Sequence, residues 1–502
     1  MAMKNIDEGG PVDRVVTVGE FDKSARESYR KPEKEKIRGG LSGVELSEDS
    51  KKSCKGHISD ESGAITEVEF DYFHSELNAL DFELSENEKS YLNESLALQD
   101  LKFHIYSREW GGDGSIEDRP EKKVYVLLHG WTATHAIYSD VIRHNNLTMV
   151  EEILARDPSA IIVVPDGNGF GESRFKKQFE RPEIDMYRES THNEKMTLIE
   201  AQRMIISDKS TPEYYAMQME FLIGVVLDLE GAYNEKLEKV RGSDRVAVLG
   251  HSMGGSAAMV MAVKWGYQHC LASAPALFPT KRNEEYMESH QDLLRENKAA
   301  ERLYRFLGNS IDLAFHVERL KGFMSSLSEF TVKQVFYAIG KELMGRKISG
   351  DPEKDKIMLQ HLGAIHVDEL TTDKLLTAST TILNLINGID FSKWSMQEIA
   401  NLENVEIISG KFDTLVPWEE LMFTLTTISA YALDAQSEGV PGSDEAADAA
   451  VKLVQRVIIP GLVKGEVYKK EDDSGHYRAL LGDETVTRKL VAMVHENKGE
   501  EK

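Results

Sequence analysis

One serine of this chain lies between two glycines at the end of an apolar run. The segment DRVAVLGHSMGGSAAMVMAVKWG spans residues 244–266 and contains Gly250-His251-Ser252-Met253-Gly254. An apolar run, a glycine turn and a stretch of small residues predict a buried strand, a sharp turn and a helix. A serine at such a turn has strained backbone and an exposed hydroxyl. Ser252 is therefore the candidate catalytic nucleophile.

A serine hydroxyl is a weak nucleophile at neutral pH and needs a general base. Histidine suits this role because its unperturbed pKa of about 6.5 is close to working pH, and a carboxylate must then orient the ring. The segment VEIISGKFDTLVPWEE, residues 405–420, has the pattern of a buried strand that ends in a loop at Asp413. Asp413 is the candidate acid, and Asp390 is its main rival.

The elements that would position these residues follow an alternating pattern. Continuously apolar runs at 122–130, 159–169, 244–252 and 404–413 predict strands that are buried on both faces. Alternating apolar residues at 66–77 and 101–110 predict further strands, and the segments 140–157 and 215–233 have helical spacing. Strands that alternate with helices indicate parallel βαβ units, with the site at the carboxyl ends of the strands.

In this context the chain resembles the α/β-hydrolase superfamily, in which GHSMGG is a frequent form of the nucleophile turn. The resemblance covers roughly residues 95–500. It implies an α/β fold with an eight-stranded, mostly parallel sheet flanked by helices. It also implies a catalytic triad in the chain order serine, acid, histidine. The pattern Gly-x-x-Asp-x-x-Val-Pro, common in the family, is matched by Gly410, Asp413, Val416 and Pro417.

Two histidines follow Asp413 in the sequence. His476 lies in the polar segment EDDSGHYRALL, just before an apolar helical pattern, as the family often presents its base. His495 lies near the end of TVTRKLVAMVHENKG, in the last turn of a predicted helix, where it favours the helix dipole. We predict His476 as the general base.

The resemblance also implies an oxyanion hole. The segment LLHGWTAT at 127–134 is similar to the oxyanion segment of the family, so the backbone N–H groups of Trp131 and Met253 are the predicted donors. His129 is expected to brace this loop through its ring. The loop PDGNGFGESR has the family spacing Asp-x-x-Gly-x-Gly-x-Ser, starting at Asp166, and a structural role is expected for it.

The predicted organisation has four parts. Residues 1–65 are polar and predicted to be a disordered arm, since they offer too little apolar surface to offset chain entropy. Residues 66–279 and 401–502 form the two parts of the α/β core, and residues 280–400 form a helical cap inserted between them. The stretch 430–454 has the pattern of a loop and a helix, for which a second lid is one interpretation.

The composition excludes several classes of protein. The net charge of −25 repels nucleic acid and anionic lipid, so neither is an expected partner. The two cysteines, Cys54 and Cys270, have no spacing typical of a disulfide framework or a zinc site. No apolar run approaches the length of a membrane span, and the first thirty residues have no signal-peptide pattern. A cytoplasmic location is expected.

These features predict an enzyme that hydrolyses a carboxylic ester through an acyl-enzyme on Ser252. The pattern requires no metal and no organic cofactor, and the expected partner is a small, apolar ester or acyl substrate. The alternatives are acyl transfer, C–C bond hydrolysis or haloperoxidase chemistry on the same triad, and a catalytically silent ligand-binding scaffold. The sequence does not determine the oligomeric state.

Overall fold

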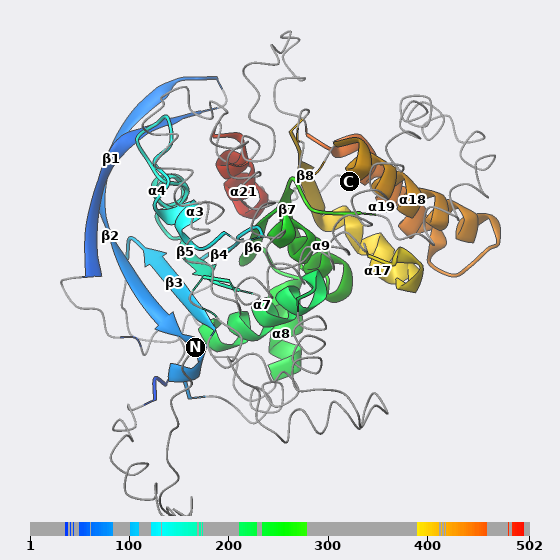
Figure 1. The fold of residues 1–502 in the computed structure, drawn as a ribbon, viewed down its shortest axis with the longest axis horizontal. Helices are drawn as coiled ribbons and strands as arrows, with labels where there is room; N and C mark the ends of the chain where they lie inside the picture. Colours follow the sequence, from blue (N-terminus) through cyan, green and yellow to red (C-terminus); the bar gives the residue numbers. More distant parts are fainter. Residues whose placement is uncertain are drawn as a thin grey trace, which may run out of the picture. The chain divides into compact units, whose positions relative to one another are not determined.

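The structure, a computed structural model, contains an eight-stranded sheet (Figure 1). The strand order is β1-β2-β3-β5-β4-β6-β7-β8. The five strands from β5 to β8 in this order run parallel, and β3 runs antiparallel to β5. The strands are β1 (Lys51–Ser59), β2 (Ile65–Asn78), β3 (Lys102–Ser107), β4 (Val124–Leu128), β5 (Ile161–Pro165), β6 (Val246–His251), β7 (His269–Ser273) and β8 (Val405–Ile408).

The structure describes part of the 502-residue chain. The described residues are 36–38, 41, 44, 50–60, 62–83, 101–109, 122–131, 133–167, 170–171, 173, 210–227, 233–278, 389–410, 413, 416, 418–458, 480 and 484–495. Most of the predicted cap, 280–388, lies outside them, and so does the segment that contains His476.

The central strands are apolar on both faces because helices cover both sides of the sheet. Every residue of β4, β5, β6 and β7 is buried. Successive side chains of β4 alternate between two apolar clusters. Val124 and Val126 belong to the first, and Tyr125 and Leu127 to the second. The continuous apolar runs in the sequence therefore correctly predicted buried strands.

One set of helices packs on each face of the sheet. The first cluster contains side chains of α7 (Pro212–Leu227), α8 (Tyr233–Arg241), α9 (Met253–Trp265), α17 (Met396–Ala400), α18 (Trp418–Ser437) and α19 (Ser443–Arg456). The second contains side chains of α3 (Ala136–Ser139), α4 (Met149–Arg156) and α21 (Thr485–His495). None of the helices in the described ranges is both long and apolar enough to cross a membrane.

The helix predicted over 140–157 begins later than expected, at Met149. Thr148 is its N-cap, and its side chain accepts a hydrogen bond from the Glu151 backbone N–H at 3.2 Å. The Glu151 carboxylate in turn accepts from the Thr148 backbone N–H at 2.8 Å. This reciprocal capping satisfies two of the N–H groups that a helix start leaves unpaired, which defines the start of α4.

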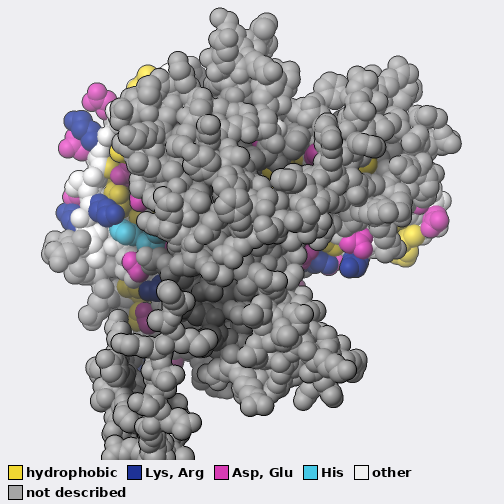
Figure 2. Space-filling model, viewed as in Figure 1, with side chains coloured by type: hydrophobic (Ala, Val, Ile, Leu, Met, Phe, Trp, Pro, Cys, Tyr) yellow, Lys and Arg dark blue, Asp and Glu magenta, His cyan; other side chains and the backbone are white. Residues whose placement is uncertain are grey.

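The prediction that residues 1–65 form a disordered arm is wrong at its carboxyl end, because residues 51–59 form β1. This strand pairs along its whole length with β2, from Lys51 opposite Phe73 to Ser59 opposite Ile65. Oppositely charged side chains meet across the pair, as in Lys55–Glu69 at 3.1 Å. Figure 2 shows Lys and Arg side chains (dark blue) beside Asp and Glu side chains (magenta) at the left of the view. An edge strand needs few apolar residues, since its backbone hydrogen bonds go to its neighbour and one face remains in solvent.

Two other predicted boundaries differ from the structure. Residues 389–400 were assigned to the cap, yet Phe391 and Ile399 are buried in the first apolar cluster. In the stretch 430–454, residues up to Ser437 continue α18. The residues that follow Gly442 form α19, whose buried alanines belong to the same cluster. The small side chains of α19 allow close packing, so this helix is part of the core and not a lid.

A buried ionic network connects α4 to the C-terminal helix. The carboxylate of Glu152, fully buried, bonds Arg143 at 2.6 Å and Arg156 at 3.0 Å. The hydroxyl of Thr487, in α21, donates to the same carboxylate. Removing one member would leave buried charges without compensation.

We therefore expect Glu152→Ala to lower the free energy of unfolding by about 3–5 kcal/mol. The exposed pair Lys452–Asp448 provides the control, and Asp448→Ala should change stability by less than about 0.5 kcal/mol. Urea unfolding of both variants measures the difference. If both substitutions lowered the free energy of unfolding equally, the stabilising role of the buried network would be contradicted.

Candidate active site

Ser252 lies between the end of β6 and the start of α9, in a strained conformation. Its φ is 53° and its ψ is −114°, a region that costs a non-glycine residue about 1–3 kcal/mol. It is the N-cap of α9, but its side chain makes no capping hydrogen bond. Serines at this position usually cap the helix with their hydroxyl. The Ser252 hydroxyl therefore does not cap the helix that follows it.

Three glycines allow this turn to form. A Cβ on Gly250 would lie 1.9 Å from the Gly254 carbonyl oxygen, and a Cβ on Gly254 would lie 2.2 Å from that of Leu128. A Cβ on Gly130 would lie 3.2 Å from the Ser252 Cβ. The turn therefore packs directly against the segment that follows β4.

The register of the sheet explains this contact. Leu128 pairs with Gly250 across β4 and β6, so Gly130 and Ser252 are both two residues beyond the same pair. The predicted oxyanion donors come next in each segment. Trp131 follows Gly130, and Met253 is the first residue of α9, where the positive end of the helix dipole lies. The assignment of these two N–H groups to an oxyanion hole stays a prediction.

Asp413 is 4% exposed and follows β8. Its Oδ1 accepts a hydrogen bond from the Val416 backbone N–H at 2.8 Å, which orients the carboxylate. A carboxylate has about four acceptor positions, so one carboxylate can accept from both a backbone N–H and an imidazole. Ser273 of β7 pairs with Ile408 of β8, and β7 separates β6 from β8. Two strand spacings amount to roughly 10 Å, a gap that an imidazole can bridge.

Of the two histidines after Asp413, the structure describes only His495. His476 lies outside the described residues, so its role stays a prediction. His495 ends α21, and its Nε2 lies 2.9 Å from a carboxylate oxygen of Asp157. Asp157 precedes β5, at the amino end of the parallel strands, whereas Ser252 follows the carboxyl end of β6. A strand of five residues spans about 16 Å, which places His495 too far from Ser252 to act as its base.

Asp390, the rival acid, caps a short helix. Its carboxylate accepts from the backbone N–H of Ser392 at 3.2 Å and from the Ser392 hydroxyl at 2.6 Å. This is the arrangement of a helix-starting aspartate.

His129 braces the loop after β4, as expected from the sequence. Its Nε2 accepts a hydrogen bond from the Gly167 backbone N–H at 3.0 Å. Its Nδ1 lies 2.9 Å from the Gly130 carbonyl oxygen, to which it donates. Complete burial lowers the pKa of His129, so the ring is neutral. The ring therefore connects the loops that follow β4 and β5, immediately beside Ser252.

The loop after β5 is built around Asp166, which is fully buried. Its Oδ1 accepts from the backbone N–H of His135 at 2.7 Å. Gly171 has a φ of +60°, and a Cβ there would lie 2.3 Å from the Asp166 carboxyl carbon. Ser173 accepts from the Lys102 backbone N–H at 2.7 Å, which ties the loop to β3. These contacts fit the structural role expected for the Asp-x-x-Gly-x-Gly-x-Ser pattern.

The strand order, the strained serine between β6 and α9, and the aspartate after β8 define a protein of the α/β-hydrolase fold. The fold class predicted from the sequence is thereby confirmed.

Among solved structures, the chain is similar to the enol-lactonase from Burkholderia xenovorans LB400, with 13% identity and a TM-score of 0.36 over 79% of this chain and 97% of that one. It is also similar to a thermophilic esterase from Thermogutta terrifontis, with 14% identity and a TM-score of 0.34 over 88% and 99%. The sequence matches no protein-family model and no curated protein. Because these TM-scores are low, the fold assignment rests on the topology and the serine turn.

Substitution at the glycine turn tests how tightly it is packed. We expect Gly250→Ala to lower the free energy of unfolding by about 1–3 kcal/mol, since the new methyl group meets rigid backbone. Gly242→Ala is the control, because a Cβ there meets its nearest neighbour at 3.6 Å. Denaturant unfolding measures both variants. A Gly250→Ala protein as stable as the control would show that the turn has room.

The buried His129 predicts a pH dependence of stability. In the unfolded chain its pKa is about 6.5, and in the folded protein it is lower, so the unfolded state binds the proton first. The stability that comes from His129 is present above pH 6.5 and is lost as the pH falls.

The matched variant is His129→Gln, whose side chain does not titrate, and the quantity to compare between it and the wild type is the free energy of unfolding. Below pH 6.5 the difference in stability between the two should shrink by up to about 1.4 kcal/mol per pH unit. Urea unfolding at several pH values between 7.5 and 5 measures it. A constant difference would mean that His129 has an ordinary pKa.

Proposed function

We propose that this protein is a serine hydrolase that cleaves a carboxylic ester through an acyl-enzyme on Ser252. The observation that carries the proposal is the strained backbone of Ser252 together with its hydroxyl, which makes no capping hydrogen bond. A non-glycine residue is held at a φ of 53°, and its hydroxyl is not used to cap α9. Structural strain of this kind persists only where the surroundings impose it, and it concentrates at functional sites.

The reaction follows from the proposed triad. The Ser252 Oγ attacks the ester carbonyl carbon while its proton passes to His476, which Asp413 orients. The negative oxygen of the tetrahedral intermediate accepts hydrogen bonds from the N–H groups of Trp131 and Met253. His476 then returns the proton to the departing alkoxide, and the C–O bond breaks. Water repeats these steps on the acyl-enzyme, which releases the acid and restores Ser252.

We infer an apolar acyl group, because apolar side chains lie close to the serine turn. Trp131 is partly buried and packs against the first apolar cluster, directly after Gly130. Phe278 and Leu277, beyond β7, belong to the same cluster. The Ala276 N–H donates to the Ser252 carbonyl at 3.0 Å, so this apolar segment is fixed beside the turn.

A fluorophosphonate probe tests whether Ser252 is activated. We expect one adduct, mapped by mass spectrometry to Ser252 and absent from Ser252→Ala. Ser243→Ala, which removes a serine near the opposite end of β6, should label like the wild type. Asp413→Asn should slow hydrolysis of a short-chain aryl ester by about 10³–10⁴-fold, because the ring loses its orientation.

The histidines provide a matched pair. His476→Gln should abolish labelling, whereas His495→Gln should leave it unchanged, since His495 bonds Asp157 at the other end of the sheet. Loss of labelling in both variants would point to unfolding, which circular dichroism detects. A folded wild-type protein that reacts neither with the fluorophosphonate nor with smaller sulfonyl fluorides would contradict the proposal and favour a ligand-binding scaffold.

A further inference from the structure

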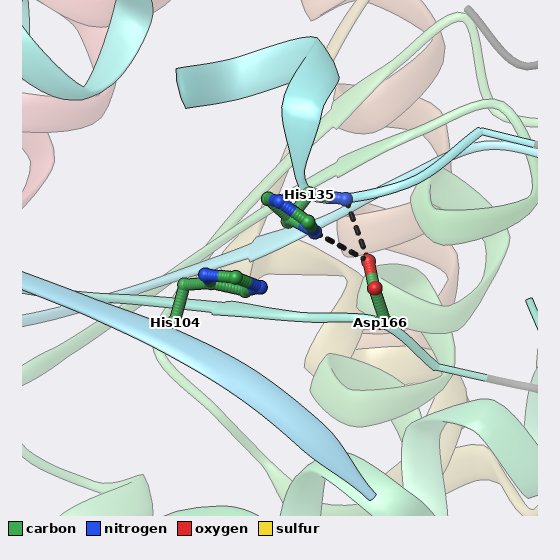
Figure 3. A group of neighbouring side chains, drawn as sticks. All are labelled: His104, His135 and Asp166. Atoms are coloured by element: carbon green, nitrogen blue, oxygen red, sulfur yellow. Dashed lines mark hydrogen bonds and ion pairs between the residues drawn. The ribbon is translucent and has the colours of Figure 1, made fainter. Parts of the chain in front are cut away.

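Two histidines and an aspartate meet outside the proposed triad (Figure 3). His104 comes from β3, His135 from the segment before α3, and Asp166 from the loop after β5. One donor atom of each residue lies within 4.8 Å of those of the other two. His104 is 4% exposed and Asp166 fully buried, while the His135 side chain is 20% exposed. The cluster is therefore close to the surface but built from buried groups.

The His104 ring is oriented toward the Asp166 carboxylate (Figure 3). Its Nδ1 lies 3.0 Å from the Nε2 of His74, and its own Nε2 is buried without a hydrogen-bond partner among the described residues. A buried N–H without an acceptor costs about 1–3 kcal/mol. The favoured tautomer thus has the proton on Nδ1, donated to His74, and a lone pair on Nε2. Histidines that bind metals typically donate their second nitrogen in this way.

A metal ion binds imidazole in its neutral form, through a lone pair such as the one that this tautomer leaves on the His104 Nε2.

We propose that His104, His135 and Asp166 form a binding site for a divalent transition-metal ion of the Zn²⁺ type. Two imidazoles and one carboxylate are a ligand set that Zn²⁺ uses when one coordination position remains for water. The His135 Nδ1 lies 3.1 Å from the Asp166 Oδ1. Two ligands at about 2.1 Å from an ion in tetrahedral or octahedral geometry are roughly 3.0–3.4 Å apart. The ion replaces the proton that these two atoms share.

Such an ion would connect three segments that are distant in the sequence. His135 follows the predicted oxyanion segment, and Asp166 directly precedes Gly167, which bonds His129. The ion would hold these two loops to β3. The ion is not part of the proposed triad, so its first effect is on stability.

Metal content of the full-length protein tests the proposal. The protein is stripped with a chelator, incubated with ZnCl₂ and freed of excess ion, and bound zinc is measured by mass spectrometry. We expect about one equivalent in the wild type and less than a tenth of that in His104→Gln and His135→Gln. His144→Gln, which changes a half-exposed histidine of the same region, should retain the wild-type amount. Zn²⁺ should also raise the melting temperature of the wild type and of His144→Gln only.

X-ray absorption of the zinc-loaded wild type gives a second measurement that requires no variant. The zinc spectrum should show two imidazole ligands together with oxygen. Failure of the wild type to retain zinc would overturn the proposal. So would equal zinc in all variants, or a spectrum without two imidazoles, since either result means that the ion binds elsewhere.

Discussion

The backbone of Ser252 is the constraint on which the site depends. Its conformation is unfavourable for a residue with a Cβ, so neighbouring structure must impose it. The Ser252 N–H donates to the Ser273 carbonyl at 2.9 Å, and its own carbonyl accepts from Ala276 at 3.0 Å. Below the turn, Gly254 packs where a side chain would collide with Leu128. Strands β4 and β7, on either side of β6, thus hold the serine in place.

The second constraint is the connection between the loops at the carboxyl ends of β4 and β5. These loops begin at His129 and Asp166, and each supplies a buried polar group to the other. His129 accepts from Gly167, and Asp166 accepts from His135. A buried polar group without a partner raises the free energy of the folded state. Displacing either loop would break one of these bonds, so both loops are held in place. The position of the predicted oxyanion segment is therefore set in part by buried side chains outside the proposed triad.

The C-terminal part of the chain is anchored separately. Leu480 is buried in the second apolar cluster, and Glu484 pairs with Arg156 of α4. His476 is four residues before Leu480, and four residues span at most about 14 Å. The anchoring of Leu480 and α21 thus limits where the proposed base can lie.

The sequence alone was sufficient for features that depend on local pattern. Buried strands require uninterrupted apolar runs, and a strand-to-helix turn around a nucleophile requires small residues, so β4 to β6 and the turn at Ser252 were predicted correctly. The bracing role of His129 was predicted as well. The strand β1 was missed because an edge strand can be polar, its stability coming from pairing with β2. Only the tertiary structure brings together His104, His135 and Asp166, because the register of β3 against β5 decides which side chains of distant segments meet.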